Sequence, residues 1–159
     1  MRPRRVSLAL LVALSGQAVA AERLNSEQLR EEITGNTLTG FNTSGVVFSE
    51  YHAPDGRIFG HNNGVPVVDG CWAIRGDAIC YYYNGQKPLP AAFCWHYDRA
   101  GAKGYRITSV DLRITGAARL EPGNPRNHNE GERSWVCEGL ISRLRTPLAP
   151  VSVRLDRRP

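Results

Sequence analysis

The feature that most constrains the fold is a regular alternation, from Asn36 onward, of short β-type runs and clusters of turn residues. The runs are rich in β-branched and aromatic residues, and glycine, asparagine, aspartate or proline separates them about every ten residues. No helical crossover lies between them that would indicate a parallel sheet. The pattern predicts a mainly β domain, an antiparallel meander that closes into a lipocalin-like barrel or a small sandwich. We expect strands over 37–41, 46–52, 57–60, 70–75, 78–83, 91–98 and 105–114.

One short helix is expected before this meander. Asn25 is suited to cap it, and Gln28 lies at the capping-box position three residues later. Gly35 is placed to end the helix in a left-handed turn. The sequence therefore predicts a helix over 26–34 that packs on the body of the fold and keeps its charged face in solvent.

The first twenty residues have the three parts of a secretory signal peptide. Three arginines form a positive start, an apolar run follows over 6–16, and small residues at 18–20 form a cleavage site. The apolar run is shorter than the roughly 20 residues that a membrane-spanning helix needs. We therefore expect 1–20 to be a signal peptide and 21–159 to be one periplasmic or secreted domain, with no membrane span after cleavage.

Charge gives little support for nucleic acid as a partner. The net charge of +5 at pH 7 includes the three arginines of the signal peptide, so residues 21–159 carry only +2. A nucleic-acid-binding domain normally has a basic face with interleaved aromatic residues. The nearest feature is the arginine-rich end that follows Arg143, and such an end is typical of a solvated tail.

All four cysteines lie in the exported part, as Cys71, Cys80, Cys94 and Cys137. An even number in a small exported domain indicates two disulfides, for which three pairings exist. A metal site needs closely spaced ligand pairs, but the sequence has no C-x-x-C and the spacings are 9, 14 and 43 residues. We therefore predict disulfides, and neither a metal site nor a cofactor.

The strand register of the central hairpins narrows the choice among the three possible disulfide pairings. A two-residue turn at Gly76-Asp77 fixes how the strands on either side of it pair. If Cys80 also lies opposite Cys94, the two form a cross-strand disulfide, which leaves Cys71 to pair with Cys137. A slip of one residue would place Cys80 and Cys94 on opposite faces of the sheet and remove this pairing.

The same register gathers large side chains on one face of the sheet, because side chains alternate between the two faces. That face carries Trp72, Ile74, Ile79, Tyr81, Tyr83, Phe93, Trp95 and Tyr97. In one interpretation the face is simply the core of a small barrel. In the other, part of it lines a cup for a planar or apolar ligand. The candidate ligand-binding residues are Trp72, Tyr81, Tyr83, Phe93 and Trp95.

The sequence contains no recognisable catalytic motif: G-x-S-x-G, H-E-x-x-H, the phosphate-binding loop and the dinucleotide fingerprint are all missing. His96 and Asp98 lie two residues apart on the face opposite the aromatic one, where a carboxylate is able to orient an imidazole. The pair lacks a nucleophile, since Tyr82 on the same face is an unactivated phenol. We predict no catalytic residue, and keep a small hydrolase using His96 and Asp98 as the alternative.

The end of the chain changes character. A polar, breaker-rich stretch over 115–133 is interpreted as a loop, which is either a contact surface or a connection without a role. The segment 135–145 has an apolar pattern that predicts a last strand.

Four short motifs resemble a recurring family of proteobacterial proteins. They are the run GNTLTG at 35–40, the turn PDG at 54–56, the segment GCWAI at 70–74 and the segment DAIC at 77–80. The family consists of small exported β-rich proteins of uncharacterised function, and the likeness extends over 29–97. The resemblance implies a shared β fold much more strongly than any activity, because its motifs are turn, tryptophan and cysteine positions.

The sequence therefore favours a binding or interaction module of the cell envelope. A protein partner predicts an exposed apolar or charged patch around 116–133, whereas a small apolar ligand predicts a cavity inside the aromatic face. The hydrolase alternative needs His96 and Asp98 in an accessible cleft beside a third reactive group.

Overall fold

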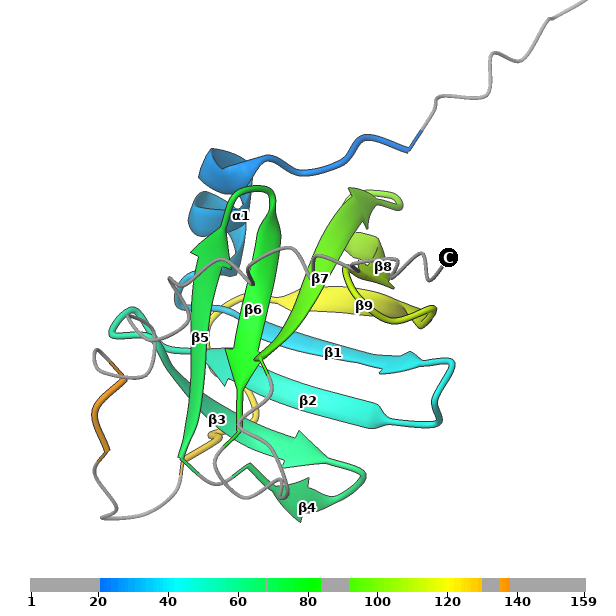
Figure 1. Cartoon of the computed structure of the whole chain (residues 1–159). Helices are drawn as coiled ribbons and strands as arrows, with labels where there is room; N and C mark the ends of the chain where they lie inside the picture. The colour runs from blue at the N-terminus through cyan, green and yellow to red at the C-terminus, as the bar shows by residue number, and fades with distance from the viewer. Residues whose placement is uncertain (1–20, 68, 84–91, 130–134, 138–159) are drawn as a thin grey trace, which may run out of the picture.

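The computed structural model describes residues 21–67, 69–83, 92–129 and 135–137 (Figure 1). The expected signal peptide and most of the expected strand over 135–145 lie outside these residues. One helix precedes nine strands in the described part of the chain. The elements are α1 (Ser26–Ile33), β1 (Thr37–Asn42), β2 (Val47–His52), β3 (Arg57–Asn62), β4 (Val65–Pro66), β5 (Gly70–Arg75), β6 (Ala78–Tyr82), β7 (Ala92–Arg99), β8 (Gly104–Ser109) and β9 (Thr115–Glu121).

Eight of these strands form a closed antiparallel barrel. Apart from the two-residue β4, each strand pairs with the next one along the chain, and β9 pairs with β1 to close the ring. The strand β4 pairs only with the end of β3. The predicted mainly β meander is confirmed, and of its two expected forms the barrel is the one observed.

The strand β9 corrects the interpretation of 115–133 as a loop. The expected strand over 105–114 ends at Ser109, a turn follows, and β9 begins at Thr115. Small residues such as Gly116 and Ala117 have little intrinsic preference for strands, so the local sequence did not reveal this element. The strand forms because β1 and β8 hydrogen-bond to it on its two sides.

Helix α1 agrees with its prediction and closes one end of the barrel. The Asn25 side chain accepts hydrogen bonds from the backbone N–H groups of Glu27 and Gln28, and the Gln28 side chain accepts one from the Asn25 backbone N–H. Gly35 has the expected left-handed backbone, with φ of 74°. No helix in the described part of the chain is long and apolar enough to cross a bilayer.

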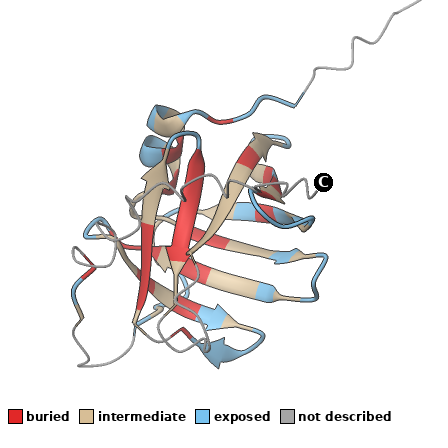
Figure 2. Ribbon diagram, viewed as in Figure 1, coloured by how far each residue is buried: buried red, intermediate tan, exposed pale blue. Residues whose placement is uncertain are grey.

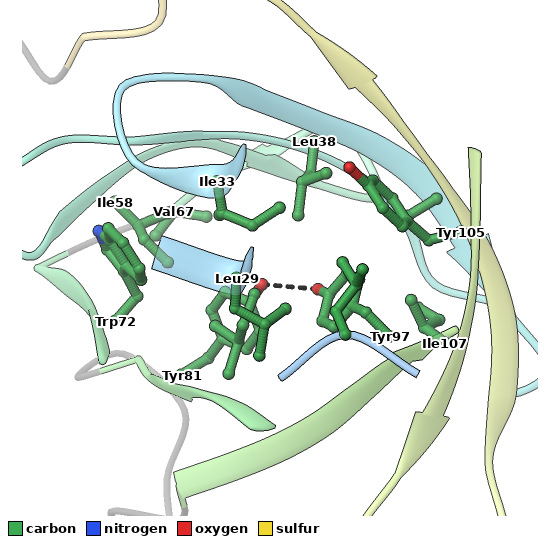
Figure 3. Close-up of a cluster of buried hydrophobic side chains, with 13 residues drawn as sticks. Leu29, Ile33, Leu38, Ile58, Val67, Trp72, Tyr81, Tyr97, Tyr105 and Ile107 are labelled. Atoms are coloured by element: carbon green, nitrogen blue, oxygen red, sulfur yellow. Dashed lines mark hydrogen bonds between the residues drawn. The ribbon is translucent and has the colours of Figure 1, made fainter. Parts of the chain in front are cut away.

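The core lies at the end of the barrel that α1 covers, which we call the helix end. Leu29 and Ile33 of α1 are fully buried and point toward Leu38, Tyr81 and Tyr97 inside the barrel (Figure 3). The charged face of α1 is not merely solvated, because Glu32 binds the guanidinium of Arg99 and the hydroxyl of Tyr105. Figure 2 shows exposed positions at the tips of the β1–β2 and β3–β4 hairpins and on the outer side of α1.

Three glycines allow the strands to bend into so small a ring. A Cβ atom added at Gly40, Gly60 or Gly116 would lie 2.0–2.2 Å from a carbonyl oxygen of the neighbouring strand. No other residue fits such an approach, and glycine at these places is typical of the bends in small barrels. Gly60 in β3 lies opposite Glu50 in β2, so no side chain from β3 faces that carboxyl group at this pair.

Both predicted disulfides are present, together with the predicted register. Cys80 lies opposite Cys94 and is bonded to it, and Cys71 is bonded to Cys137. The second disulfide fastens the end of the described chain over the seam between β3 and β5, where only two residue pairs are in register. Trp135 adds to this seal, since its indole N–H donates to the carbonyl of Gly70 at 3.0 Å.

We expect the Cys71–Cys137 disulfide to contribute more stability than Cys80–Cys94. The Cys71–Cys137 bond closes a loop of 66 residues, and the Cys80–Cys94 bond closes a loop of 14. Loop entropy then predicts a loss of about 4 kcal/mol for Cys71→Ala with Cys137→Ala, and about 3 kcal/mol for Cys80→Ala with Cys94→Ala. Urea unfolding of the two double variants and the wild type measures both values. An equal or smaller loss for the first pair would contradict the role of the C-terminal segment as a seal.

Candidate functional site

The barrel contains a cavity of about 150 Å³ at the end opposite α1, which we call the hollow end. A cavity of this size admits a benzene-sized molecule. It reaches solvent between the β1–β2 turn and the β8–β9 turn, because Ser44 and Leu112 both line it and are both exposed. The described lining residues are Asn42, Ser44, Val46, Phe48, Glu50, Asn62, Tyr81, Tyr83, Phe93, Trp95, Tyr97, Ile107, Leu112 and Ile114.

Four of the five candidate ligand-binding residues line this cavity: Tyr81, Tyr83, Phe93 and Trp95. The fifth, Trp72, lies elsewhere. Its indole N–H donates to the carbonyl of Ala53 at 3.0 Å, and its ring packs edge-on against His52. Trp72 thus belongs to the buried core at the helix end and does not line the cavity.

The aromatic residues form one wall of the cavity from two neighbouring strands. The rings of Tyr81 on β6 and of Tyr83, which directly follows this strand, are nearly parallel, with centroids 6.2 Å apart and an interplanar angle of 4°. On the adjacent strand β7, Phe93 pairs with Tyr81, and Trp95 follows two residues later on the same face. A flat ligand is able to stack on such a wall or meet it edge-on.

Glu50 is the one acidic group among the described lining residues. It lies in the middle of β2 and only 4 % of it is exposed. The Tyr83 hydroxyl donates to its Oε1 at 2.7 Å, and the Asn62 side chain also hydrogen-bonds to it. None of the ion pairs in the described part of the chain involves Glu50. Burial therefore dominates and raises the pKa of Glu50 to about 7.

A buried hydrogen-bonded chain closes the bottom of the cavity. His52 Nδ1 lies 3.1 Å from the carbonyl oxygen of Glu50, and Nε2 lies 3.1 Å from the Tyr81 hydroxyl. The Tyr81 hydroxyl lies 2.7 Å from that of Tyr97 (Figure 3). A carbonyl only accepts, so Nδ1 donates to it; because burial lowers the pKa of His52 to about 4, the ring is neutral. Nε2 then accepts from Tyr81, and Tyr97 donates to Tyr81.

The polar groups inside the barrel therefore have two different roles. The Tyr81 hydroxyl is hydrogen-bonded to both His52 and Tyr97, so the hydroxyls of Tyr81 and Tyr97 are part of the fold. The carboxyl of Glu50, with Tyr83 beside it, is the strongest hydrogen-bonding group that faces the cavity.

Sequence reasoning missed the role of Glu50. Its position could have been inferred from the alternation of side chains along a strand, which places Phe48, Glu50 and His52 of β2 on one face. That signal is ambiguous, because the odd-numbered face carries Val47 and Tyr51 and is equally apolar. Only closure of the barrel decides which of the two faces is inside.

His96 and Asp98 lie on the outer face of β7, as predicted, but bind different partners. His96 Nδ1 lies 2.8 Å from the carbonyl oxygen of Asp77, and Asp98 forms an ion pair of 3.0 Å with Arg23. These contacts do not favour the hydrolase alternative. Within the described ranges, no cluster of three or more His, Cys, Asp and Glu side chains is placed to hold a metal ion.

The expected patch around 116–133 is not apolar where the structure describes it. The exposed large hydrophobic residues lie at other positions, among them Phe41 and Val47 on the outside of the barrel. Over 116–129, no large hydrophobic residue is exposed. Of the two kinds of patch expected for a protein partner, the apolar one is not present over 116–129, while Arg119 and Arg126 are exposed there.

Comparison with protein-family models, with curated proteins and with solved structures gives no match. The argument about function therefore depends on the geometry of the cavity and on the groups that line it.

We predict that Glu50→Gln changes how stability depends on pH. Folded Glu50 keeps its proton up to about pH 7, whereas in the unfolded chain it loses it near 4.5, so stability falls as pH rises between these values. His52 has the opposite sign: it binds a proton near pH 6.5 only when unfolded, so stability rises from about pH 4 to 6.5. Each effect amounts to about 3 kcal/mol.

The two effects nearly cancel in the wild type between pH 4.5 and 6.5. The Glu50→Gln variant keeps only the His52 effect, so its stability should rise over this interval and then level off. Urea unfolding at a series of pH values measures both curves, with Glu31→Gln on the exposed face of α1 as the control. Parallel curves for wild type and Glu50→Gln would contradict the burial of an ionisable carboxyl group.

Proposed function

We propose that the protein is an exported binding protein of the cell envelope that holds a small, planar, apolar ligand in the hollow end of its barrel. The observation that supports this function is the cavity itself, which has an aromatic wall and an opening to solvent. Small antiparallel barrels use their interiors in this way to hold one small ligand. The volume suits a ligand of one aromatic ring, because larger ligands occupy pockets of roughly 300 Å³ or more.

The wall and the rim suggest how such a ligand binds. Its ring stacks on the aromatic side chains Tyr81, Phe93 and Trp95, where it is removed from water. Leu112 lines the opening and is 46 % exposed, so it is placed to cover a bound molecule. The hydrogen-bonded chain below keeps the wall rigid, so little ordering is needed on binding.

The proposed location agrees with the two disulfides, which are typical of proteins outside the cytoplasm. The expected signal peptide would deliver the protein there. We favour a ligand over a protein partner because four of the predicted aromatic residues line the cavity, whereas 116–129 exposes charged residues such as Arg119 and Arg126 but no large apolar one.

Binding of toluene and indole to the purified domain tests this function. We expect dissociation constants below about 1 mM, measured by titration calorimetry and by the fluorescence change of Trp95. Val46→Trp should weaken binding at least about tenfold, because Val46 lines the cavity and the larger ring fills it. Val47→Trp is the matched control, since the neighbouring side chain is 61 % exposed and does not line the cavity.

Two results would count against the proposal. The first is the absence of binding by either compound up to its solubility limit. The second is equal weakening by Val46→Trp and Val47→Trp, which would place the bound molecule outside the barrel.

A further inference from the structure

We propose that the ligand carries a protonated amine and that Glu50 is its counter-ion, so that the hollow end selects small arylalkyl ammonium ions. This inference rests on the proposed ligand-binding function and adds the chemical class of the ligand. It names Glu50 as the residue that determines specificity.

The charge of the cavity points to a cation. Among the described lining residues one is acidic and none is basic. The faces of aromatic rings are also negative, and Tyr81, Tyr83, Phe93 and Trp95 surround the same space. A carboxylate or phosphate ligand would be repelled by both features, whereas an ammonium group is attracted by both.

The bonding of Glu50 leaves room for a further donor. A carboxylate accepts at about four lone-pair sites. Within the described residues, the side-chain donors to Glu50 are the Tyr83 hydroxyl and the Asn62 amide. Its cross-strand partner in β3 is Gly60, so no side chain from that position competes for the carboxyl group, and Glu50 itself lines the cavity. An ammonium N–H group is therefore able to reach the carboxylate from the cavity.

An ammonium ion would also offset the unfavourable free energy of burying an ionised carboxylate at this site. A buried carboxylate without a cation is unfavourable, and this one keeps its proton up to about pH 7 because its pKa is raised by burial. A bound cation supplies the missing charge, so binding should ionise Glu50 and release its proton. The bond is then a charge-assisted one, which is stronger than a bond between neutral groups.

None of the other titratable side chains that face Glu50 inside the barrel should change charge between pH 5 and 8, whereas His128 contacts the neighbouring Ser49 on the other face of β2. Tyr81 on β6, Tyr83 directly after it and Tyr97 on β7 face it, and burial raises the pKa of each hydroxyl above its ordinary value. His52, on β2 itself, stays neutral because burial lowers its pKa to about 4. A pH dependence of binding in this interval thus reports on Glu50.

The test compares benzylamine with toluene and benzoate, which share one ring and differ in charge. We expect the wild type at pH 8 to bind benzylamine at least about tenfold more tightly than toluene, the equivalent of one charge-assisted hydrogen bond. Benzoate should bind more weakly than toluene. In Glu50→Gln the preference should fall to within about threefold, while Glu31→Gln on the exposed face of α1 keeps it.

The pH profile gives a second measurement. Benzylamine binding to the wild type should weaken roughly 100-fold from pH 8 to pH 5, as Glu50 gains its proton, and toluene binding should not change. Tyr83→Phe removes a hydrogen bond that lowers the pKa of Glu50, so it should move the midpoint of the benzylamine profile to higher pH. This variant keeps the inference testable even if Glu50→Gln does not fold.

The outcomes separate the two proposals. If toluene binds inside the barrel but benzylamine binds no better, or if its affinity does not change with pH, the inference about Glu50 is wrong and the proposed function stands. If neither compound binds, both are wrong. Benzylamine binding without toluene binding supports the inference, because the amine then supplies the affinity.

Discussion

The pairing of β9 with β1 is the interaction on which the rest of the structure depends. It turns a meander with two exposed edges into a ring without edges, and it defines an inside and an outside for every strand. Only after closure does the even-numbered face of β2 become interior, and only then do Glu50 and the aromatic residues of β6 and β7 face one another. The bends at Gly40, Gly60 and Gly116 serve the same closure, because they let neighbouring backbones approach more closely than any side chain would allow.

The sequence predicted the parts of the fold that local chemistry determines. The turn at Gly76-Asp77 determined the register of the two strands beside it, and the assumption that Cys80 lies opposite Cys94 added the third strand, both disulfides and the aromatic face. The capping box at Asn25 predicted the helix, and Ser26 is indeed its first residue. The strand β9 was missed because its residues are small and its pairing partners lie far away in the sequence. Long-range pairing of this kind leaves no local signal.

The sequence predicted only one wall of the cavity, the aromatic one. Its aromatic wall follows from the alternation of side chains along β6 and β7, which a single assumed register provides. The opposite wall depends on which face of β2 is inside, and the sequence of β2 is apolar on both faces. Trp72 was assigned to the site because it shares a face with the other aromatic residues. A face extends along the whole barrel, however, and α1 fills one end of it, so sharing a face with Tyr83 does not bring Trp72 to the same cavity.

The position of Glu50 is easier to understand as a binding feature than as a structural one. An apolar residue in the middle of β2 would fill part of the cavity and would avoid the burial of an ionisable group, which lowers the stability of the folded state as pH rises from about 4.5 to 7. Buried His52 is different, because its two ring nitrogens are both satisfied and its hydrogen bonds hold Tyr81 in place. Glu50 has donors on one side and open space on the other. A cationic ligand that fills this space would stabilise the fold as it binds, since it removes the penalty of the buried charge. Ligand binding and the stability of the barrel would then be coupled through one carboxyl group.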